Sequence, residues 1–222
     1  MKSPCAPTTP AVCWPLTYIH NVVNPFKPDA YFDFDLFKKH VALAQRIMDD
    51  IIDLELEKIE RIMAKIDSDP ENEDVKHTES VLWQKIYKKS GQGRRTGVGI
   101  TAEGDMLAAL GLRYGTEEAT EFAEKVHQTV ALSAYRSSVE MAKERGAFEV
   151  YDSEREKNNP FINRLREADP ELYEEMKKYG RRNIACLTIA PTGTTSLMTQ
   201  TTSGIEPVFL PVLQATSQSQ SE

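Results

Sequence analysis

The residues of this chain with the clearest potential for chemistry are hydroxyl side chains that follow a short apolar segment. Residues 184–189 are apolar and favour a β-strand, and Pro191 follows them. The next positions are Thr192, Gly193, Thr194, Thr195 and Ser196. If a helix begins at about Thr195, its free backbone N–H groups and the positive end of its dipole face this turn, which suits a phosphate or another anion. A strand, a proline-glycine turn and a helix N-cap explain the same residues without a ligand, and the local pattern by itself favours this simpler interpretation.

A second polar turn follows a few residues later. The segment Ser203–Pro207 places the carboxylate of Glu206 beside a glycine and a proline. Glycine and proline at neighbouring positions interrupt helix and strand, so this segment should be a loop. Two irregular polar loops beside a buried strand are typical of the wall of an active site. We therefore expect Pro191, Gly204 and Glu206 to line a pocket.

Other side chains that could bind a metal or react are less well arranged. Glu124 and His127 have the helical spacing of a di-iron ligand pair, but such a site needs a second pair and two further glutamates. Cys5, Cys13 and Cys186 fit neither a disulfide framework nor a zinc site. Cys186 lies within the apolar segment, where a thiol is more often a small core side chain than a reagent. We predict no metal site.

Several longer stretches of the chain resemble a known family. They are PTGTTS (191–196), SGIEPVF (203–209), GRRTGVGITAEGDMLAALGLRYGTEEA (93–119), AYRSSVEMAKERGAF (134–148) and DAYFDFDLF (29–37). Over roughly residues 22–210 the chain resembles the large catalytic subunit of ribonucleotide reductase, and is most like the adenosylcobalamin-dependent class II. The resemblance is to the C-terminal portion of that family's barrel only. It implies a helix-rich, partial segment of a ten-stranded α/β barrel, with the hydroxyl loop holding the phosphates of the ribonucleotide substrate.

The resemblance also shows what this chain lacks. In that family a cysteine in an Asn-x-Cys-x-Glu loop removes a hydrogen from the ribose, and no such motif occurs here. The resemblance therefore implies no catalytic residue in this chain, which by itself is expected to be inactive. Cys13 lies near the position of one of the cysteines that reduce the substrate, but its neighbours Val12 and Trp14 depart from the family pattern. A redox role for Cys13 is the less favoured interpretation.

Two hypotheses for function follow from the resemblance. In the first, the chain is a portion of an oxidoreductase, a ribonucleoside di- or triphosphate reductase, and forms the substrate-phosphate wall of a site for deoxyribonucleotide synthesis. Adenosylcobalamin would serve the complete enzyme, and the partner would be the remaining part of the barrel or a second copy of this chain. In the second, the chain is a catalytically silent assembly protein, or a decayed fragment, that keeps the fold.

The charge and hydropathy of the chain exclude several other classes. The net charge is -7 and the pI is near 5.3, whereas nucleic-acid-binding surfaces are usually basic. The basic residues that do cluster are Lys88, Lys89, Arg94 and Arg95, and a solvated turn and an anion contact explain them equally well. There is no long apolar run or signal-peptide pattern, so we expect no membrane contact and a cytoplasmic location.

The spacing of apolar residues predicts a chain dominated by helix. We expect a long helix from its cap Asp35 to Pro70, and shorter strands at 98–100 and 184–189. Further helices are predicted over 73–89, 103–110 and 116–145, with one or two more within 161–178. The expected organisation is an irregular N-terminal tail (1–21), a partial barrel domain (22–212) and a disordered Gln/Ser tail (213–222).

Overall fold

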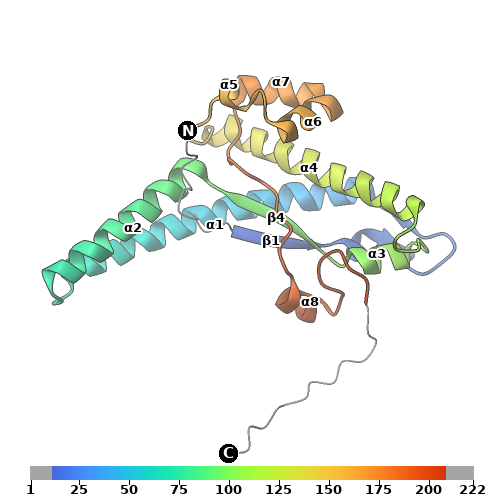
Figure 1. Cartoon of the computed structure of the whole chain (residues 1–222), viewed down its shortest axis with the longest axis horizontal. Coiled ribbons are helices and arrows are strands. Elements are labelled where there is room, and N and C mark those ends of the chain that lie inside the picture. The colour runs from blue at the N-terminus through green and yellow to red at the C-terminus, as the bar shows by residue number, and fades with distance from the viewer. Residues whose placement is uncertain (1–11, 209–222) are drawn as a thin grey trace, which may run out of the picture.

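The computed structural model describes residues 12–208, with side chains described from Pro15 onward. Its elements in chain order are β1 (Val12–Thr17), the 3-10 helix η1 (Tyr18–Asn21), β2 (Val22–Val23), β3 (Tyr31–Phe32), α1 (Phe34–Ser68), α2 (Glu73–Gly93), β4 (Thr96–Thr101), α3 (Glu103–Ala109), α4 (Glu117–Arg145), α5 (Ser153–Glu156), α6 (Pro160–Ala168), α7 (Pro170–Tyr179) and α8 (Gly193–Thr199). Figure 1 shows α1 and α4 alongside the two longer strands, with α5, α6 and α7 gathered at one side. The predicted excess of helix over strand is confirmed.

The N-cap of the first long helix lies two residues before the expected one. Asp33, and not Asp35, is the N-cap of α1, because its Oδ1 accepts hydrogen bonds from the backbone N–H groups of Asp35 and Leu36. The helix continues to Ser68, just before the predicted end at Pro70. Its apolar residues at spacings of three and four are buried, which places Phe37, Val41 and Met48 in the core.

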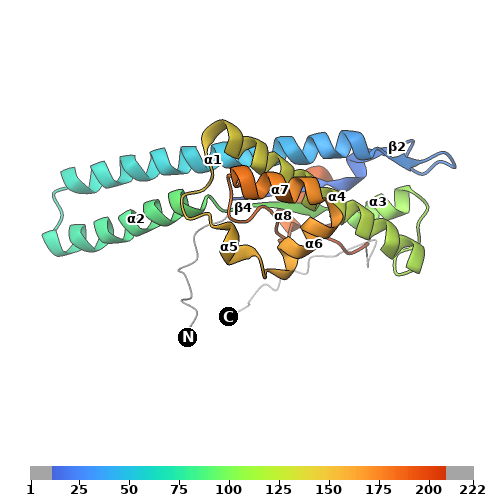
Figure 2. The same cartoon turned by 90° about the horizontal axis from the view of Figure 1, so that it is seen from above.

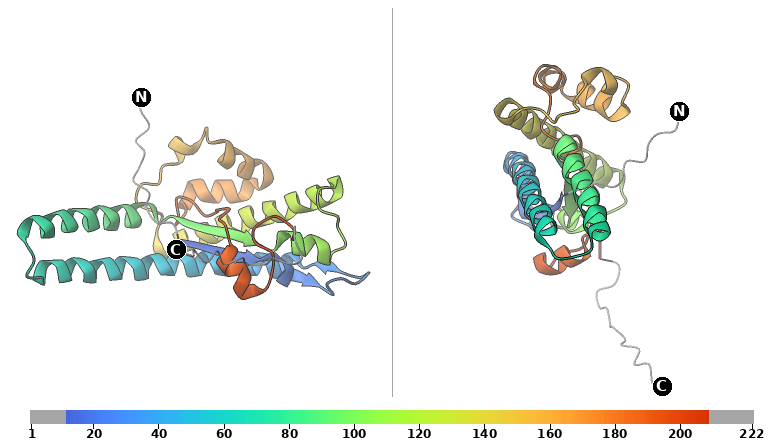
Figure 3. Two further views of the ribbon diagram at one scale, coloured as in Figure 1. Left: turned by 60° about the horizontal axis from the view of Figure 1, so that its bottom comes forward. Right: turned by 90° about the vertical axis from the view of Figure 1, so that its left-hand side faces the viewer.

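Helix α2 runs antiparallel to the distal half of α1, and the two form a hairpin that extends away from the other elements (Figures 2 and 3). Ile59 and Ile66 of α1 are buried. The predicted end of this helix at residue 89 is wrong, since α2 continues through Gly91 and Gly93. It ends where Arg94 adopts a left-handed conformation, with φ of 45°.

Three neighbouring parallel segments form the main sheet. β1 pairs with β4 in a register that sets Cys13 opposite Gly97. On the other side of β4, Val98 forms a parallel bridge with Leu187, and the Val98 N–H donates to the carbonyl of Cys186 at 2.7 Å. The segment predicted as a strand at residues 184–189 therefore lies beside β4, but it pairs with β4 only through this isolated bridge. The prediction that residues 1–21 are irregular is wrong for 12–21, because β1 and η1 form there.

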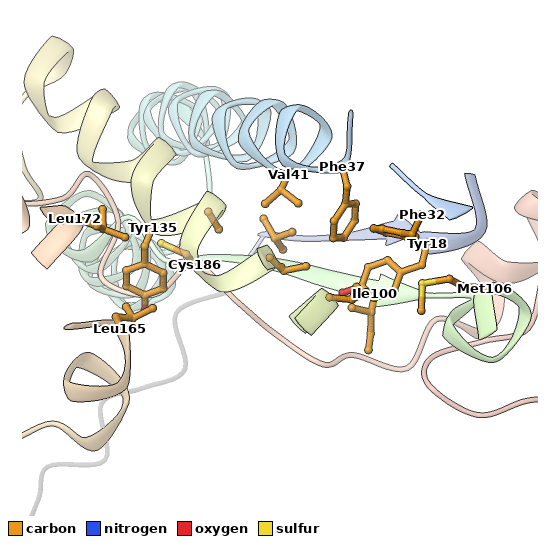
Figure 4. Packing of buried hydrophobic residues seen from close by; sticks show 14 of the residues in the cluster. Tyr18, Phe32, Phe37, Val41, Ile100, Met106, Tyr135, Leu165, Leu172 and Cys186 are labelled. Atoms are coloured by element: carbon orange, nitrogen blue, oxygen red, sulfur yellow. The ribbon is translucent and has the colours of Figure 1, made fainter. Parts of the chain in front are cut away.

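The hydrophobic core lies between this sheet and the long helices. Figure 4 shows Phe37 and Val41 of α1 with Tyr18, Ile100 and Met106, and a second group around Tyr135. The burial of these large side chains supplies most of the stabilisation, at about 1.5–3 kcal/mol for each fully buried one. No helix in the described part of the chain is long and apolar enough to cross a membrane.

A buried polar network joins α1 to residues 182–183, which directly precede the third parallel segment. The side chain of Asp49 is fully buried, and its Oδ1 accepts from Arg94 Nε at 2.8 Å and from Asn183 Nδ2 at 2.9 Å. Its Oδ2 accepts from Arg182 Nε at 3.2 Å. Burial alone would raise the pKa of Asp49, but these partners outweigh burial and hold that pKa below its usual value.

The network also decides the role of the basic cluster. Arg94 is 5% exposed and donates to Asp53 as well as to Asp49, so it is neither part of a solvated turn nor open to an outside anion. Both interpretations of the cluster are thus wrong for Arg94. The carboxylates of Asp49, Asp50 and Asp53 come close enough together to suit a cation, but Arg94 and Arg145 already face them.

The architecture is α/β and rich in helix, as predicted. The three parallel segments among residues 12–208 do not close into a barrel. The boundaries proposed for the domain at residues 22 and 212 stay predictions. The Gln/Ser tail at 213–222 lies outside the described residues.

Candidate functional site

Residues of the hydroxyl-rich turn and of the second polar loop line one hollow. This hollow has a volume of about 740 Å³. It is lined by residues 189–193, Ser196 and residues 201–208. Figure 1 shows α8 and the loop after it at the ends of the strands, away from α4 to α7. The structure therefore brings together the two segments that the sequence singled out, and Pro191, Gly204 and Glu206 all line the hollow, as expected.

Helix α8 begins at Gly193, two residues before the predicted start. Because Gly193, Thr194 and Thr195 are its first three residues, their backbone N–H groups have no intrahelical acceptor. No other hydrogen-bond acceptor for these groups occurs among the described residues. A Cβ placed on Gly193 would have no atom within 4 Å, so the backbone is open to close approach at this point. Thr194 is exposed and Thr195 is half-buried.

Thr192 faces the interior and joins the two loops. Its side chain is buried, its Oγ1 donates to Thr101 Oγ1 at 3.1 Å, and it accepts from the backbone N–H of Gly204 at 2.8 Å. Thr101 Oγ1 in turn donates to the carbonyl of Thr202 at 3.1 Å. The chain of hydrogen bonds therefore runs from the second loop through Thr192 to the end of β4 and back to the second loop.

Ser196 is also engaged within the protein. It is buried, and its Oγ donates to the carbonyl of Gly193 at 2.8 Å. Of the five residues predicted to hold phosphates, Thr192 and Ser196 thus direct their hydroxyls to the chain itself. The backbone N–H groups of Gly193, Thr194 and Thr195, and the hydroxyls of the two threonines, have no described partner in the protein. The sequence did not distinguish these two sets.

The second loop lies directly on the N-terminal turn of α3. A Cβ on Gly104 would stand 2.6 Å from Cα of Pro207, so only glycine allows this contact. The Thr202 N–H donates to Asp105 Oδ2 at 2.7 Å, and the Ala102 N–H donates to the carbonyl of Thr202 at 3.1 Å. Gly104 and Asp105 are supporting residues that the local pattern did not identify, although both lie in one of the stretches quoted above.

The hollow offers neutral hydrogen-bond donors and little charge. Glu206 is exposed and is the only charged side chain among the lining residues. No arginine or lysine is among the residues that line the hollow. An anion bound there would be held by N–H groups and hydroxyls without an ion pair. The lining set also contains no histidine and no cysteine. These donors suit a phosphate or a ribose rather than the metal of a corrin, and we assign no corrin contact to them.

The cysteines and the Glu-x-x-His pair play other roles. Cys186 is fully buried, and burial raises the pKa of its thiol to about 12, so it is a core side chain, as predicted. Cys13 lies in β1, but its side chain is not among those described, and its redox role stays a prediction. His127 Nε2 lies 2.8 Å from Glu103 Oε2 of α3, whereas Glu124 is exposed.

The comparisons with known proteins agree with the resemblance seen in the sequence. The model of the family described as "Ribonucleotide reductase, barrel domain" matches residues 10–222. Among curated relatives, a vitamin B12-dependent ribonucleoside-diphosphate reductase from Mycobacterium tuberculosis is 29% identical over 82% of this chain. A protein of the same description from Thermoplasma acidophilum is 31% identical over 80% of it. A ribonucleoside-diphosphate reductase subunit alpha from Chlamydia pneumoniae is 26% identical over 85% of it.

The chain spans only about a fifth of the length of these relatives, 20%, 18% and 18% respectively. The family match nevertheless extends over nearly all of this chain and includes both loops of the hollow. The chain belongs to the ribonucleotide reductase barrel-domain family.

Proposed function

We propose that this chain forms the substrate-phosphate wall of a ribonucleotide reductase active site, for the synthesis of deoxyribonucleotides from ribonucleoside di- or triphosphates. The observation that carries the proposal is the open turn Gly193–Thr195, which begins at the edge of the hollow with Gly193 and whose backbone N–H groups and threonine hydroxyls have no described partner. Pro191, Gly204 and Glu206 complete the lining, and Thr192 and Ser196 hold the turn in shape.

In this proposal the chain positions the substrate and leaves the redox chemistry to other groups. The N–H groups of the turn bind the phosphates, and the fixed distance between turn and second loop orients the ribose. Such positioning is effective because a displacement of about 1 Å from a reactive geometry can be costly in rate. Two relatives are named vitamin B12-dependent, and we infer adenosylcobalamin as the radical source of the complete enzyme.

The proposal predicts that this chain alone reduces no ribonucleotide, because it contains no Asn-x-Cys-x-Glu motif. It should still bind ribonucleotides weakly, with affinity that depends on the phosphates and not on the nucleoside. Titration calorimetry with a nucleoside, its diphosphate and its triphosphate measures this dependence. A deoxynucleotide product formed by the chain alone, above the rate without protein, would contradict the proposed division of labour.

Gly193→Ala is the sharpest test of the turn. The new methyl group meets no atom of the protein, and alanine favours a helix more than glycine does, so stability should be unchanged or slightly higher. The methyl would nevertheless keep a phosphate from the backbone. Thr194→Val removes an exposed hydroxyl and should weaken binding by about 1–3 kcal/mol if that group bonds a charged phosphate.

The matched control is Thr78→Val on α2, which replaces another exposed threonine far from the hollow in sequence. It should leave nucleotide affinity unchanged. If Gly193→Ala and Thr194→Val both bind di- and triphosphates as well as the unmodified chain, the turn is not a phosphate site. The second candidate, a catalytically silent assembly protein, predicts that outcome together with no phosphate-dependent binding, and the missing Asn-x-Cys-x-Glu motif is what favours it.

A further inference from the structure

Among the hydroxyl side chains that line the hollow, one is exposed and has no partner in the described part of the chain. These side chains belong to Thr192, Ser196, Thr201, Thr202 and Ser203. Thr192 and Ser196 bond to the protein, and Thr201 Oγ1 lies 2.8 Å from Thr199 Oγ1. Thr202 Oγ1 is buried and closed to a ligand. Ser203 is exposed, and neither its hydroxyl nor its backbone N–H has a described partner. Ser203 is therefore the hydroxyl that the hollow offers to a bound molecule.

The two neighbours of Ser203 hold it in place. On one side, the Thr202 N–H donates to Asp105 Oδ2 at 2.7 Å. On the other side, the Gly204 N–H donates to Thr192 Oγ1 at 2.8 Å, and the Gly204 carbonyl accepts from the first N–H group of α3 at 3.3 Å. Because the backbone is fixed on both sides of Ser203, little conformational freedom is lost there when a ligand binds.

The carboxylate of Glu206 lies close to the same point of the loop. A Cβ placed on Gly204 would stand 3.0 Å from Glu206 Oε2, so this carboxylate folds back over the glycine that follows Ser203. Glu206 is exposed and lines the hollow, and no described hydrogen bond or ion pair involves its side chain. A carboxylate only accepts hydrogen bonds, whereas a serine hydroxyl both donates and accepts. The loop therefore presents a charged acceptor and a neutral hydroxyl side by side.

These two groups suit the sugar of a nucleotide better than its phosphates or its base. Like charges repel, so Glu206 disfavours a phosphate beside it. The 2′ and 3′ hydroxyls of ribose are neighbouring donors, and a carboxylate that accepts from a ribose hydroxyl is a recurring arrangement in nucleotide sites. Every ribonucleotide carries these two hydroxyls, whereas the hydrogen-bonding groups of the bases differ. Recognition of the sugar therefore does not depend on the base.

We propose that Ser203 and Glu206 form a ribose subsite in the hollow, in which the carboxylate accepts hydrogen bonds from the sugar hydroxyls and the serine hydroxyl donates to one of them. The inference rests on the proposed function, because phosphates held at Gly193–Thr195 leave the sugar for the rest of the hollow. The subsite adds a determinant of specificity. A nucleotide without the sugar hydroxyls leaves the serine and the carboxylate without these bonds and should bind less tightly.

Titration calorimetry of the full chain with adenosine diphosphate, its 2′,3′-dideoxy form and inorganic pyrophosphate tests the subsite. The unmodified chain should bind adenosine diphosphate about 10-fold or more tightly than the dideoxy form, because a bond to a charged acceptor is strong. Ser203→Ala and Glu206→Ala should each lower this ratio of affinities about 3- to 10-fold, and the two together should bring it close to one. Ser203→Ala should leave the affinity for pyrophosphate unchanged.

Ser68→Ala and Glu71→Ala are the matched controls, because both residues are exposed and lie at the turn between α1 and α2. They should leave the ratio unchanged. A general loss of structure would weaken adenosine diphosphate and its dideoxy form equally, so the ratio separates sugar recognition from a damaged fold. Gly193→Ala should weaken the binding of all three ligands, which reports on the phosphate wall alone.

The outcomes separate this inference from the proposed function. If the unmodified chain binds pyrophosphate but does not distinguish adenosine diphosphate from the dideoxy form, the ribose subsite is wrong and the phosphate wall stands. The same holds if the distinction survives Ser203→Ala combined with Glu206→Ala. If none of the three ligands binds, the phosphate wall is overturned, and the ribose subsite with it.

Discussion

The bond between the two loops of the hollow should depend on a single hydroxyl. Thr192→Val keeps the shape of the side chain but removes the acceptor for the Gly204 N–H and the donor to Thr101. An amide that loses its hydrogen-bond partner costs about 1–3 kcal/mol when it is buried. Gly204 is only half-buried, so water can partly replace the lost partner and we expect about 1–2 kcal/mol.

This loss should appear as faster local opening and not as global unfolding. A cost of 1–2 kcal/mol corresponds to an increase of about 5- to 30-fold in the exchange rate of the Gly204 amide. Hydrogen exchange measured by mass spectrometry on a peptide that covers residues 200–208 reports this change. The amides of α4 should exchange as before, because α4 shares no hydrogen bond with Thr192.

Thr194→Val is the control for this experiment. Thr194 is exposed and its hydroxyl has no described partner, so exchange at Gly204 should not change. The two variants thereby separate a hydroxyl that supports the loop from one that is free for a ligand. Unchanged exchange in Thr192→Val, or equal acceleration in both variants, would refute the assignment of Thr192 as the bond between the loops.

Three further outcomes follow from the buried groups. Asp49→Ala leaves the Arg94 guanidinium buried with Asp53 alone and should lower the free energy of unfolding by about 3–5 kcal/mol in urea titrations, whereas Asp50→Ala, at an exposed ion pair, should cost less than about 1 kcal/mol. Because the pKa of Asp49 is lowered on folding, its contribution is complete above its unfolded value near 4 and is lost as the pH falls further; acid unfolding curves should show this loss, and Asp49→Asn should reduce their slope there. The Cys186 thiol, with its pKa raised by burial to about 12, should react with a maleimide only as fast as the protein unfolds, and rapid labelling in native buffer would contradict its place in the core.

Local sequence determined most of the helices, because a cap and an apolar stripe act over a few residues. Thr116 caps α4 through its bond to the Ala119 N–H, and Gly146 ends that helix with φ of 85°, both as expected from their types. The placement of the hydroxyl turn after an apolar segment was also visible in the sequence. Where a helix begins within a turn was less certain, as α1 and α8 show, since several neighbouring residues can serve as a cap.

Only the tertiary structure decided which polar side chains face inward. Thr192 and Thr194 are alike in sequence, but Thr192 meets Thr101, 91 positions earlier in the chain, and Thr194 meets solvent. Arg94 belongs by sequence to a basic cluster, yet it is buried because Asp49 of α1 lies beside it in the fold. The reason is physical: the burial of a polar group is offset by a partner, and that partner is brought by the packing of distant segments rather than by neighbouring residues.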